Sequence, residues 1–314
     1  MVTPWTGLDR THLTVLRELA ERGSVSAAAR ATGKSPSAVS QQLKLIQRQV
    51  GVQLVERSGR GIRLTDAGQA LADGAVSVLT AWAEAEAAWQ AYRTEARGVV
   101  RIAFFYSASE LLVPGLLDRL RAYPGIELEF GDEDVGQSEF APLTRDYDIV
   151  VAHRSDERRI AAGGRLEVVQ LLREPLDVAV PLDHRAAGQA SVTPADVIND
   201  DWIAPPEGYP IDRVLTAIAA QAGSPVRVVL RTTHLPLMER LVAAGHGVAL
   251  LPRYTTRDRS AGRFALLPLR DLRAGRFIGA LARPDRAARQ AVRVVLDELA
   301  AVAAEVADVT EDPS

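Results

Sequence analysis

The chain has 314 residues, 47% apolar and 25% charged, which is the composition of a folded protein rather than a disordered or fibrous one. It contains no cysteine, which excludes disulfides, thiol redox sensing and Cys-ligated metal centres, and no apolar run reaches the roughly 18 residues of a membrane span. The net charge of −3 is unevenly spread: residues 1–68 hold ten basic and five acidic side chains (+5), and the other 246 residues hold 27 and 35 (−8). This split predicts a polyanion-binding end joined to a domain with another task.

The first 50 residues have the pattern of three helices. Apolar residues recur at helical spacing over 9–21, and Gly23 ends that stretch. Ser24 has the position of an N-cap for a short alanine-rich helix. Ser35-Pro36 starts a third helix, with the serine as N-cap and the proline in the first helical position. The apolar face of this third helix consists of Val39, Leu43, Ile46 and Val50.

The opposite face of the third helix is polar and has no carboxylate, which suits the major groove of DNA. After Gly51, two short strands around a turn rich in Gly and Arg predict a wing that reaches phosphates or the minor groove. Residues 1–65 therefore predict a winged helix-turn-helix domain; a helix and hairpin that bind nothing are the alternative. The expected DNA-binding residues are Ser35, Ser37, Ser40, Gln41, Gln42, Lys44, Arg57, Arg60 and Arg63.

The order of short motifs in this region resembles the N-terminal signature of LysR-type transcriptional regulators. Gln47 and Val55 stand where that family usually has Glu and often has Phe, and Val25 replaces a further Phe; we interpret all three as packing variants. The resemblance implies a sequence-specific DNA-binding regulator. The matching stretches are Ala27-Ala28, Ser35 to Leu43, Val50-Gly51 with Leu54, Arg57, and Leu64 to Gly68.

Residues 66–97 predict a long dimerising helix. Apolar side chains recur at alternating steps of four and three from Leu71 to Tyr92, which is a heptad seam. Two tryptophans on the seam of an otherwise isolated helix need a partner surface to cover them. A helix packed on its own domain is the alternative, but the resemblance implies pairing through this helix. The expected dimerisation residues are Leu71, Val78, Trp82, Trp89 and Tyr92.

Residues 98–307 alternate between strands and helices, which predicts an α/β domain with a mainly parallel sheet covered on both faces. The expected strands lie near 99–105, 126–130, 148–152, 176–181, 202–203, 226–232, 247–251, 264–269 and 276–283. The expected helices lie near 107–123, 137–145, 210–222, 234–245 and 285–307.

This order resembles the effector domain of the same family, which is similar to periplasmic solute-binding proteins. The resemblance implies two lobes joined by two crossings, which the pattern puts near 171–175 and 263–269. The fold class expected for the chain is thus α/β with an N-terminal winged helix-turn-helix, a long linker helix and a two-lobed effector domain. The expected lobes are 98–172 with 268–307 and 173–267, followed by a tail at 308–314.

A small-molecule site is expected in the cleft, where strand ends and helix N-termini converge. Ser107 and Ser109 lie at a strand-to-helix turn of the kind that binds anions, and Thr233 lies at the corresponding turn of the second lobe. We place His153 at the lip of the cleft and Tyr209 in a loop that can cover a ligand. As alternatives, Ser107 and Thr233 are simple N-caps, His153 is a solvated loop residue and Tyr209 only packs.

The sequence carries no nucleophile elbow, phosphate loop or dinucleotide motif, so we expect no enzyme, no cofactor and no metal site. The acidic run Asp132–Asp134 is interpreted as a solvated turn rather than a cation site. Expected partners are double-stranded DNA, a small effector with an anion as one candidate, further copies of the chain as a dimer or tetramer, and RNA polymerase. We expect a cytoplasmic protein without membrane contact. A regulator without a ligand, or an architectural DNA binder, is the alternative.

Overall fold

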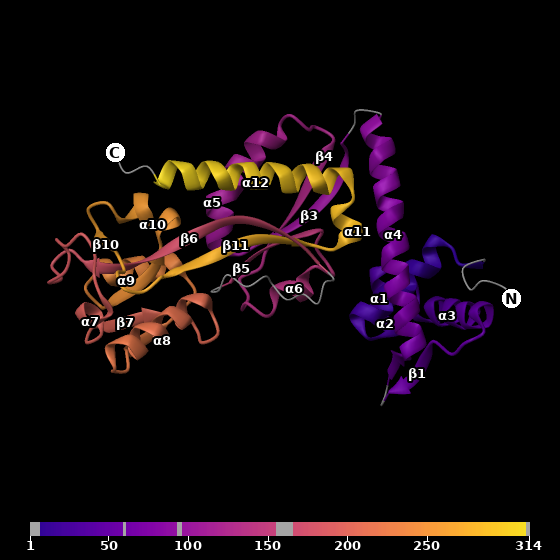
Figure 1. The fold of residues 1–314 in the computed structure, drawn as a ribbon, viewed down its shortest axis with the longest axis horizontal. Coiled ribbons are helices and arrows are strands. Elements are labelled where there is room, and N and C mark those ends of the chain that lie inside the picture. The colour runs from indigo at the N-terminus through magenta and orange to yellow at the C-terminus, as the bar shows by residue number, and fades with distance from the viewer. Residues whose placement is uncertain (1–6, 59–60, 93–95, 155–165, 312–314) are drawn as a thin grey trace. The chain divides into compact units, whose positions relative to one another are not determined.

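The structure is a computed structural model that describes residues 7–58, 61–92, 96–154 and 166–311. It divides into two compact units (Figure 1). The first comprises residues 1–96 and 283–292, and the second comprises residues 97–282 and 293–314. No helix in the described part of the chain is both long and apolar enough to cross a membrane.

The first unit opens with three helices and a two-stranded hairpin. The two expected caps form, because the side chains of Ser24 and Ser35 each accept a hydrogen bond from the backbone amide three residues on. Asp9, which was not predicted as a cap, caps the first helix in the same way. The buried faces of the three helices meet in one apolar core, so the predicted winged helix-turn-helix is confirmed. Its elements are α1 (Arg10–Arg22), α2 (Val25–Ala31), α3 (Pro36–Val50), β1 (Val55–Ser58), β2 (Gly61–Leu64) and α4 (Asp66–Tyr92).

Two positions of the N-terminal motif have a packing reason. A Cβ atom on Gly68, in the first turn of α4, would lie 2.1 Å from the carbonyl oxygen of Leu54, so only glycine fits. The side-chain oxygen of Gln47 accepts hydrogen bonds from the amides of Leu54 (2.8 Å) and Val55 (3.2 Å). The glutamine therefore keeps the acceptor that a glutamate would supply.

Helix α4 buries one face and exposes another. Ala75 and Leu79 pack against Leu13 of α1, and Leu71 packs partly on the core of its own unit, so the start of the expected seam follows the alternative interpretation. Further along, Trp82 and Trp89 are 54% and 61% exposed, and Val78 is also exposed. Val78, Trp82 and Trp89 thus form an exposed apolar face, whereas the side chain of Tyr92 lies outside the described residues.

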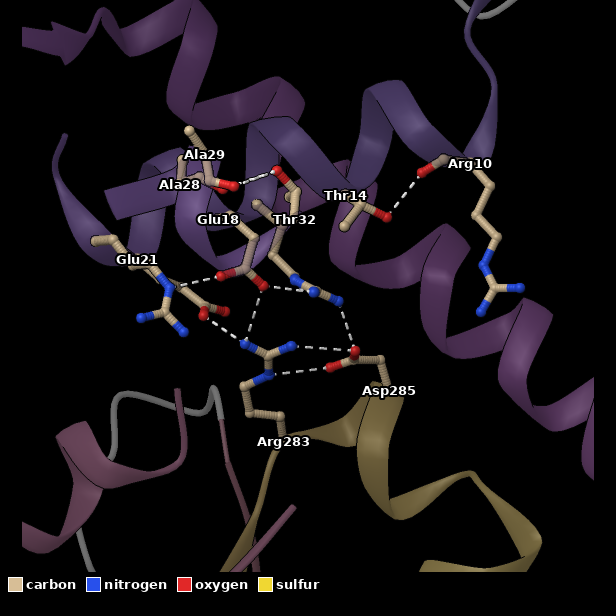
Figure 2. Close-up of polar contacts among 11 residues, drawn as sticks. Arg10, Thr14, Glu18, Glu21, Ala28, Ala29, Thr32, Arg283 and Asp285 are labelled. Atoms are coloured by element: carbon tan, nitrogen blue, oxygen red, sulfur yellow. Dashed lines mark hydrogen bonds and ion pairs between the residues drawn. The ribbon is translucent and has the colours of Figure 1, made fainter. Parts of the chain in front are cut away.

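A second segment of the chain completes the first unit. Residues 283–292 contain α11 (Pro284–Ala287) and the first turn of α12 (Gln290–Glu311), where the sequence predicted one uninterrupted helix over 285–307. Figure 2 shows charged side chains of this segment meeting those of α1. Arg17 donates from Nη2 to Glu18 and from Nη1 to Asp285, both at 2.6 Å. We call the whole cluster the ion-pair network; its members are Arg17, Arg22, Arg283, Glu18, Glu21 and Asp285.

The second unit is built on a nine-stranded sheet, in the order β4-β3-β5-β11-β6-β9-β7-β8 with β10 paired to β6. Its strands are β3 (Gly98–Phe104), β4 (Ile126–Asp132), β5 (Ile149–Arg154), β6 (Glu167–Pro181), β7 (Asp201–Ala204), β8 (Arg227–Arg231), β9 (Val248–Pro252), β10 (Phe264–Pro268) and β11 (Gly275–Ala282). Its helices are α5 (Tyr106–Leu120), α6 (Phe140–Leu143), α7 (Pro194–Val197), α8 (Pro210–Ala222), α9 (Leu235–Ala243), α10 (Arg253–Ser260) and the rest of α12.

The expectation of a mainly parallel sheet is only partly right. Strand β3 runs parallel to β4 and β5, and β7 runs parallel to β8 and β9. Strands β6 and β11 are antiparallel to all of their partners. These two strands carry the chain between the lobes. They are neighbours in the sheet and pair with each other in antiparallel register.

The crossings differ in how well the sequence located them. Residues 167–175 of β6 pair with β11, and residues 177–181 pair with β10, so the first crossing lies at its expected place near 175. Because β10 still belongs to the second lobe, the other crossing lies between Pro268 and Gly275, later than the expected 263–269. In the first lobe α5 and α12 lie side by side (Figure 1), with Arg119 Nη1 donating to Glu298 at 2.9 Å.

Candidate nucleic-acid interface and ligand pocket

Helix α3 presents an exposed polar face without a carboxylate. Ser37, Gln41 and Lys44 are exposed, and Ser40 and Gln42 are half-buried. The expected residue Ser35 is exposed too, but its hydroxyl caps the helix by accepting from the amide of Ala38 at 3.2 Å. The face opposite these polar residues is buried in the core of the unit. Such a helix can enter the major groove without repelling phosphates.

The two arginines of the wing that the structure describes, Arg57 and Arg63, differ in whether a neighbouring carboxylate offsets their charge. Strands β1 and β2 are antiparallel, and Arg57 and Arg63 are both exposed. Arg63 lies opposite Glu56 in the register and forms an ion pair with it at 2.5 Å, which partly offsets its charge. Arg57 is therefore the stronger candidate for a phosphate contact; Arg60 lies outside the described residues.

A pocket in the second unit gathers residues of both lobes. The β3–α5 turn, the end of β5 and the start of β11 contribute from one side, and the β7–α8 and β8–α9 turns contribute from the other. Four expected residues line it: Ser107, His153, Tyr209 and Thr233. The cavity is small, with a volume of about 40 Å³.

One expected residue is not among those lining the pocket. The hydroxyl of Ser109 donates to the carbonyl of Tyr106 at 2.6 Å, so it is engaged within the first turn of α5. The hydroxyl of Ser107 lies in the pocket instead and accepts a hydrogen bond from Arg276 at 2.6 Å. The capping alternative is therefore wrong for Ser107, since α5 has no side-chain cap.

One lining residue of the pocket, Arg276, belongs to a buried ion pair that the sequence did not predict. Arg276 of β11 donates to one oxygen of Glu174 from Nε (3.0 Å) and Nη2 (2.7 Å). The other oxygen of Glu174 accepts from the amide and hydroxyl of Thr255. Glu174 is 0% exposed and Arg276 is 5% exposed, so each depends on the other for charge compensation. Their register positions on adjacent strands are the only sequence-level signal, and register requires knowing the sheet.

His153 lines the pocket, but it is a buried residue of strand β5 rather than a residue at the lip of the cleft, and the alternative of a solvated loop residue is wrong. Its ring packs edge-on against Phe105 and Phe140, at centroid distances of 4.6 and 4.9 Å. Burial, reinforced by the charge of Arg276, lowers the pKa of His153 to about 3, so the imidazole is neutral at physiological pH. Its Nδ1 atom is buried without a hydrogen-bond partner, which is rare for a buried polar atom.

Asp134 is a further pocket residue that links the two lobes. Its backbone carbonyl accepts from the hydroxyl of Tyr209 at 3.2 Å, and its side chain accepts a hydrogen bond from Thr233. Asp134 is an exposed residue at the edge of the pocket, but partial desolvation there raises its pKa above its ordinary value, against the effect of the Thr233 hydrogen bond. Burial and the nearby Asp134 charge also raise the pKa of Tyr209, so its phenol stays protonated and remains a donor.

Among the described residues, no three His, Cys, Asp or Glu side chains are grouped in a way that could hold a metal ion. Of the acidic run Asp132–Asp134, Asp134 lines the pocket.

Comparisons with known proteins cover both units. Residues 11–69 match the description "Bacterial regulatory helix-turn-helix protein, lysR family", and residues 93–304 match "LysR substrate binding domain". The transcriptional dual regulator GltC of Bacillus subtilis is 27% identical over 89% of this chain and 92% of its own. The HTH-type transcriptional regulator ShiR of Corynebacterium glutamicum is 32% identical over 74% of this chain and 78% of its own.

Solved structures show the same fold along nearly the whole chain. A full-length OxyR variant from Pseudomonas aeruginosa matches with a TM-score of 0.67 and 22% identity, covering 93% of this chain and 94% of that one. CbnR, a LysR family transcriptional regulator, matches with a TM-score of 0.52 and 21% identity, covering 93% and 100%. The winged helix-turn-helix and the two-lobed domain thus occur together in these chains as they do here.

Proposed function

Because the chain belongs to the LysR family of bacterial transcriptional regulators, we propose that α3 reads operator DNA and that the pocket of the second unit receives the controlling effector. The family makes it a DNA-binding regulator with an effector-binding domain. The observation that carries the DNA-reading proposal is the acid-free polar face of α3, opposite a fully buried apolar face. We propose no catalytic role, and we place the protein in the cytoplasm, where the chromosome lies.

Within α3 we assign different tasks to different side chains. Gln41 can make paired hydrogen bonds to a base edge, so it reads sequence, whereas Lys44 supplies a point charge to a phosphate. In the wing, Arg57 adds a further phosphate contact. Ser37, Ser40 and Gln42 lie along the same helix and extend the contact surface.

Gln41→Ala is expected to change the preference among DNA sequences, with a loss of about 1–3 kcal/mol on the preferred site. Lys44→Ala is expected to weaken binding to every duplex alike and to reduce the slope of log K against log salt by about one. Fluorescence anisotropy over a salt series measures both, using duplexes selected by the wild-type protein and scrambled duplexes. Gln69→Ala, outside α3 and the wing, is the control. A uniform loss for the Gln41 variant would assign Gln41 to backbone positioning instead.

We propose that two copies of the chain pair through the exposed apolar face of Val78, Trp82 and Trp89 on α4. Large exposed aromatic side chains on one helix face are unfavourable in water and are typical anchors of protein interfaces. A dimer presents two α3 helices to two half-sites, as the family's DNA recognition requires. Assembly of dimers into a tetramer, and contact with RNA polymerase, are further proposals that rest on the family alone.

Trp82→Glu is expected to convert the dimer into monomers, because it puts a charge in the centre of this face. The loss should be roughly 3 kcal/mol or more, which is about a hundredfold in the dimer dissociation constant. Sedimentation or light scattering over a concentration series measures it. Glu84→Ala, an exposed change on the same helix, should leave the dimer intact. A dimer that survives in the Trp82 variant would put the interface elsewhere.

A further inference from the structure

We propose that the effector carries a protonated amino group received by the carboxylate of Asp134, so that the pocket prefers small amines and zwitterions to anions. The inference rests on the proposed function of the pocket and adds the chemical class of its ligand. It departs from the expectation, drawn from the helix N-terminus at Ser107, that an anion is a candidate effector.

The positive charge in the pocket is already compensated. Arg276 makes two hydrogen bonds to one oxygen of Glu174, and that carboxylate is completely buried. An anionic ligand that approached Arg276 would meet the charge of Glu174 behind it, so the pair offers little net attraction. The His153 imidazole is neutral and adds no charge of its own.

The carboxylate of Asp134, by contrast, has no ion-pair partner among the described residues. Its side-chain contact is the neutral hydroxyl of Thr233, and Arg276 acts on it only through the longer-range field. Among the residues lining the pocket, Arg276 carries the positive charge and Asp134 the negative one, and Glu174, behind the lining, offsets the charge of Arg276. The Asp134 carboxylate repels an anionic ligand and attracts a cationic one, so the pocket discriminates against anions.

The hydrogen-bonding groups at the other end of the pocket favour a polar ligand with two different ends. Ser107 accepts from Arg276 and so can turn its own proton toward a ligand, and Nδ1 of His153 is unpartnered. These groups suit an uncharged or carboxyl oxygen, while Asp134 suits an ammonium group. The cavity is small, so a larger effector has to part Tyr209 and Thr233 from Asp134 as it enters.

Four ligands of equal size test the charge preference: glycinamide (cation), glycine (zwitterion), glycolamide (neutral) and glycolate (anion). Isothermal titration calorimetry on the full-length protein measures each, at matched ionic strength and millimolar concentrations. We expect the two amines to bind about tenfold more tightly than their hydroxyl counterparts, with glycolate weakest. Asp134→Asn should remove the advantage of the amines and leave glycolamide unchanged. Asp132→Asn, two residues away and not among the residues lining the pocket, is the matched control.

Three results would overturn the proposal. Tightest binding of glycolate would show that the pocket selects anions, and the pocket would remain the effector site. An equal loss of all four ligands in Asp134→Asn would show that Asp134 only holds the lobes together. Failure of all four to bind would exclude a pocket that selects the ammonium group. None of these results bears on DNA recognition by α3, which the Gln41 and Lys44 variants test separately.

Discussion

Replacing Arg17 by methionine is expected to destabilise the DNA-binding unit by about 3 kcal/mol, because it removes one of three cations from a buried and charge-balanced network. Methionine keeps the unbranched chain and most of the volume, so the loss reports charge rather than a cavity. Glu18 is 3% exposed and Asp285 is 8% exposed, so water cannot replace the missing guanidinium. Arg22 and Arg283 still contact these carboxylates, which keeps the loss near the lower end of that for broken buried pairs.

Hydrogen exchange of peptides from α1 and α11 measures this loss within the unit concerned. Arg30→Ala, at an exposed position near the end of α2, should change exchange by no more than about 0.5 kcal/mol. If Arg17→Met changed the exchange no more than Arg30→Ala does, the ion-pair network would contribute nothing to stability.

The pH dependence provides a second check on the same network. Burial raises the pKa of Glu18, but the hydrogen bond from Arg22 and the charge of Arg17 outweigh burial, so that pKa lies below its ordinary value. The Asp285 pKa is lowered in the same way, by Arg283 and Arg17 against burial. Carboxylates of this kind stabilise the fold above their unfolded pKa, and the contribution is lost as the pH falls through the folded value.

Glu21 acts in the opposite direction, because burial outweighs the charge of Arg283 and raises its pKa. Its folded form holds the proton more tightly, so its contribution is larger in acid and declines as the pH rises. The pKa values of Glu18 and Asp285 are lowered and only that of Glu21 is raised. We therefore expect the wild-type unit to lose stability below about pH 4.5. The difference between wild type and Arg17→Met should shrink over the same range, and a constant difference from neutral pH to pH 3 would contradict this account.

Arg276→Met is expected to cost the effector domain about 3–5 kcal/mol, because it leaves the completely buried Glu174 carboxylate without a counter-charge. The two hydrogen bonds from Thr255 satisfy only one of its oxygens. Chemical unfolding followed by the fluorescence of Trp202, the only tryptophan in the second unit, measures the loss. The three tryptophans of the first unit are removed by substitution in the background protein.

The double variant Arg276→Met with Glu174→Gln should recover most of that stability, because it replaces the charged pair by two neutral groups of similar volume. Ligand binding in the pocket should stay impaired, since Ser107 loses its donor. A double variant as unstable as Arg276→Met would mean that the arginine stabilises the domain through packing on Phe105, whose ring centroid lies 5.0 Å from it, rather than through charge.

The sequence predicted the DNA-binding end well because its signals are local. The caps of α2 and α3 and the apolar face of α3 lie within a few residues of the groups that they organise. The glycine at position 68 appeared in the sequence as part of a motif, and the structure adds its reason, the approach of α4 to the Leu54 carbonyl.

The pocket was predictable only in part. Ser107, Tyr209 and Thr233 lie at turns between strands and helices, and the alternation of these elements already predicts that such turns converge. The burial of His153 could not be predicted, because a residue at the end of an apolar strand can be read equally well as its last buried residue or as the first of a loop. The second crossing was placed too early for a similar reason, since the apolar run of β10 does not tell which lobe it joins.

By itself, the sequence determined the winged helix-turn-helix, the long helix with its exposed tryptophans, the two-lobed α/β domain and their order. Only the tertiary structure decided which charges meet. Arg276 and Glu174 are 102 residues apart, and Arg17 and Asp285 are 268 apart. Helix and strand periodicity arises from backbone geometry over a few residues, so it is written locally. An ion pair between distant segments depends on sheet register and packing, and with 37 basic and 40 acidic side chains the sequence leaves its partners open.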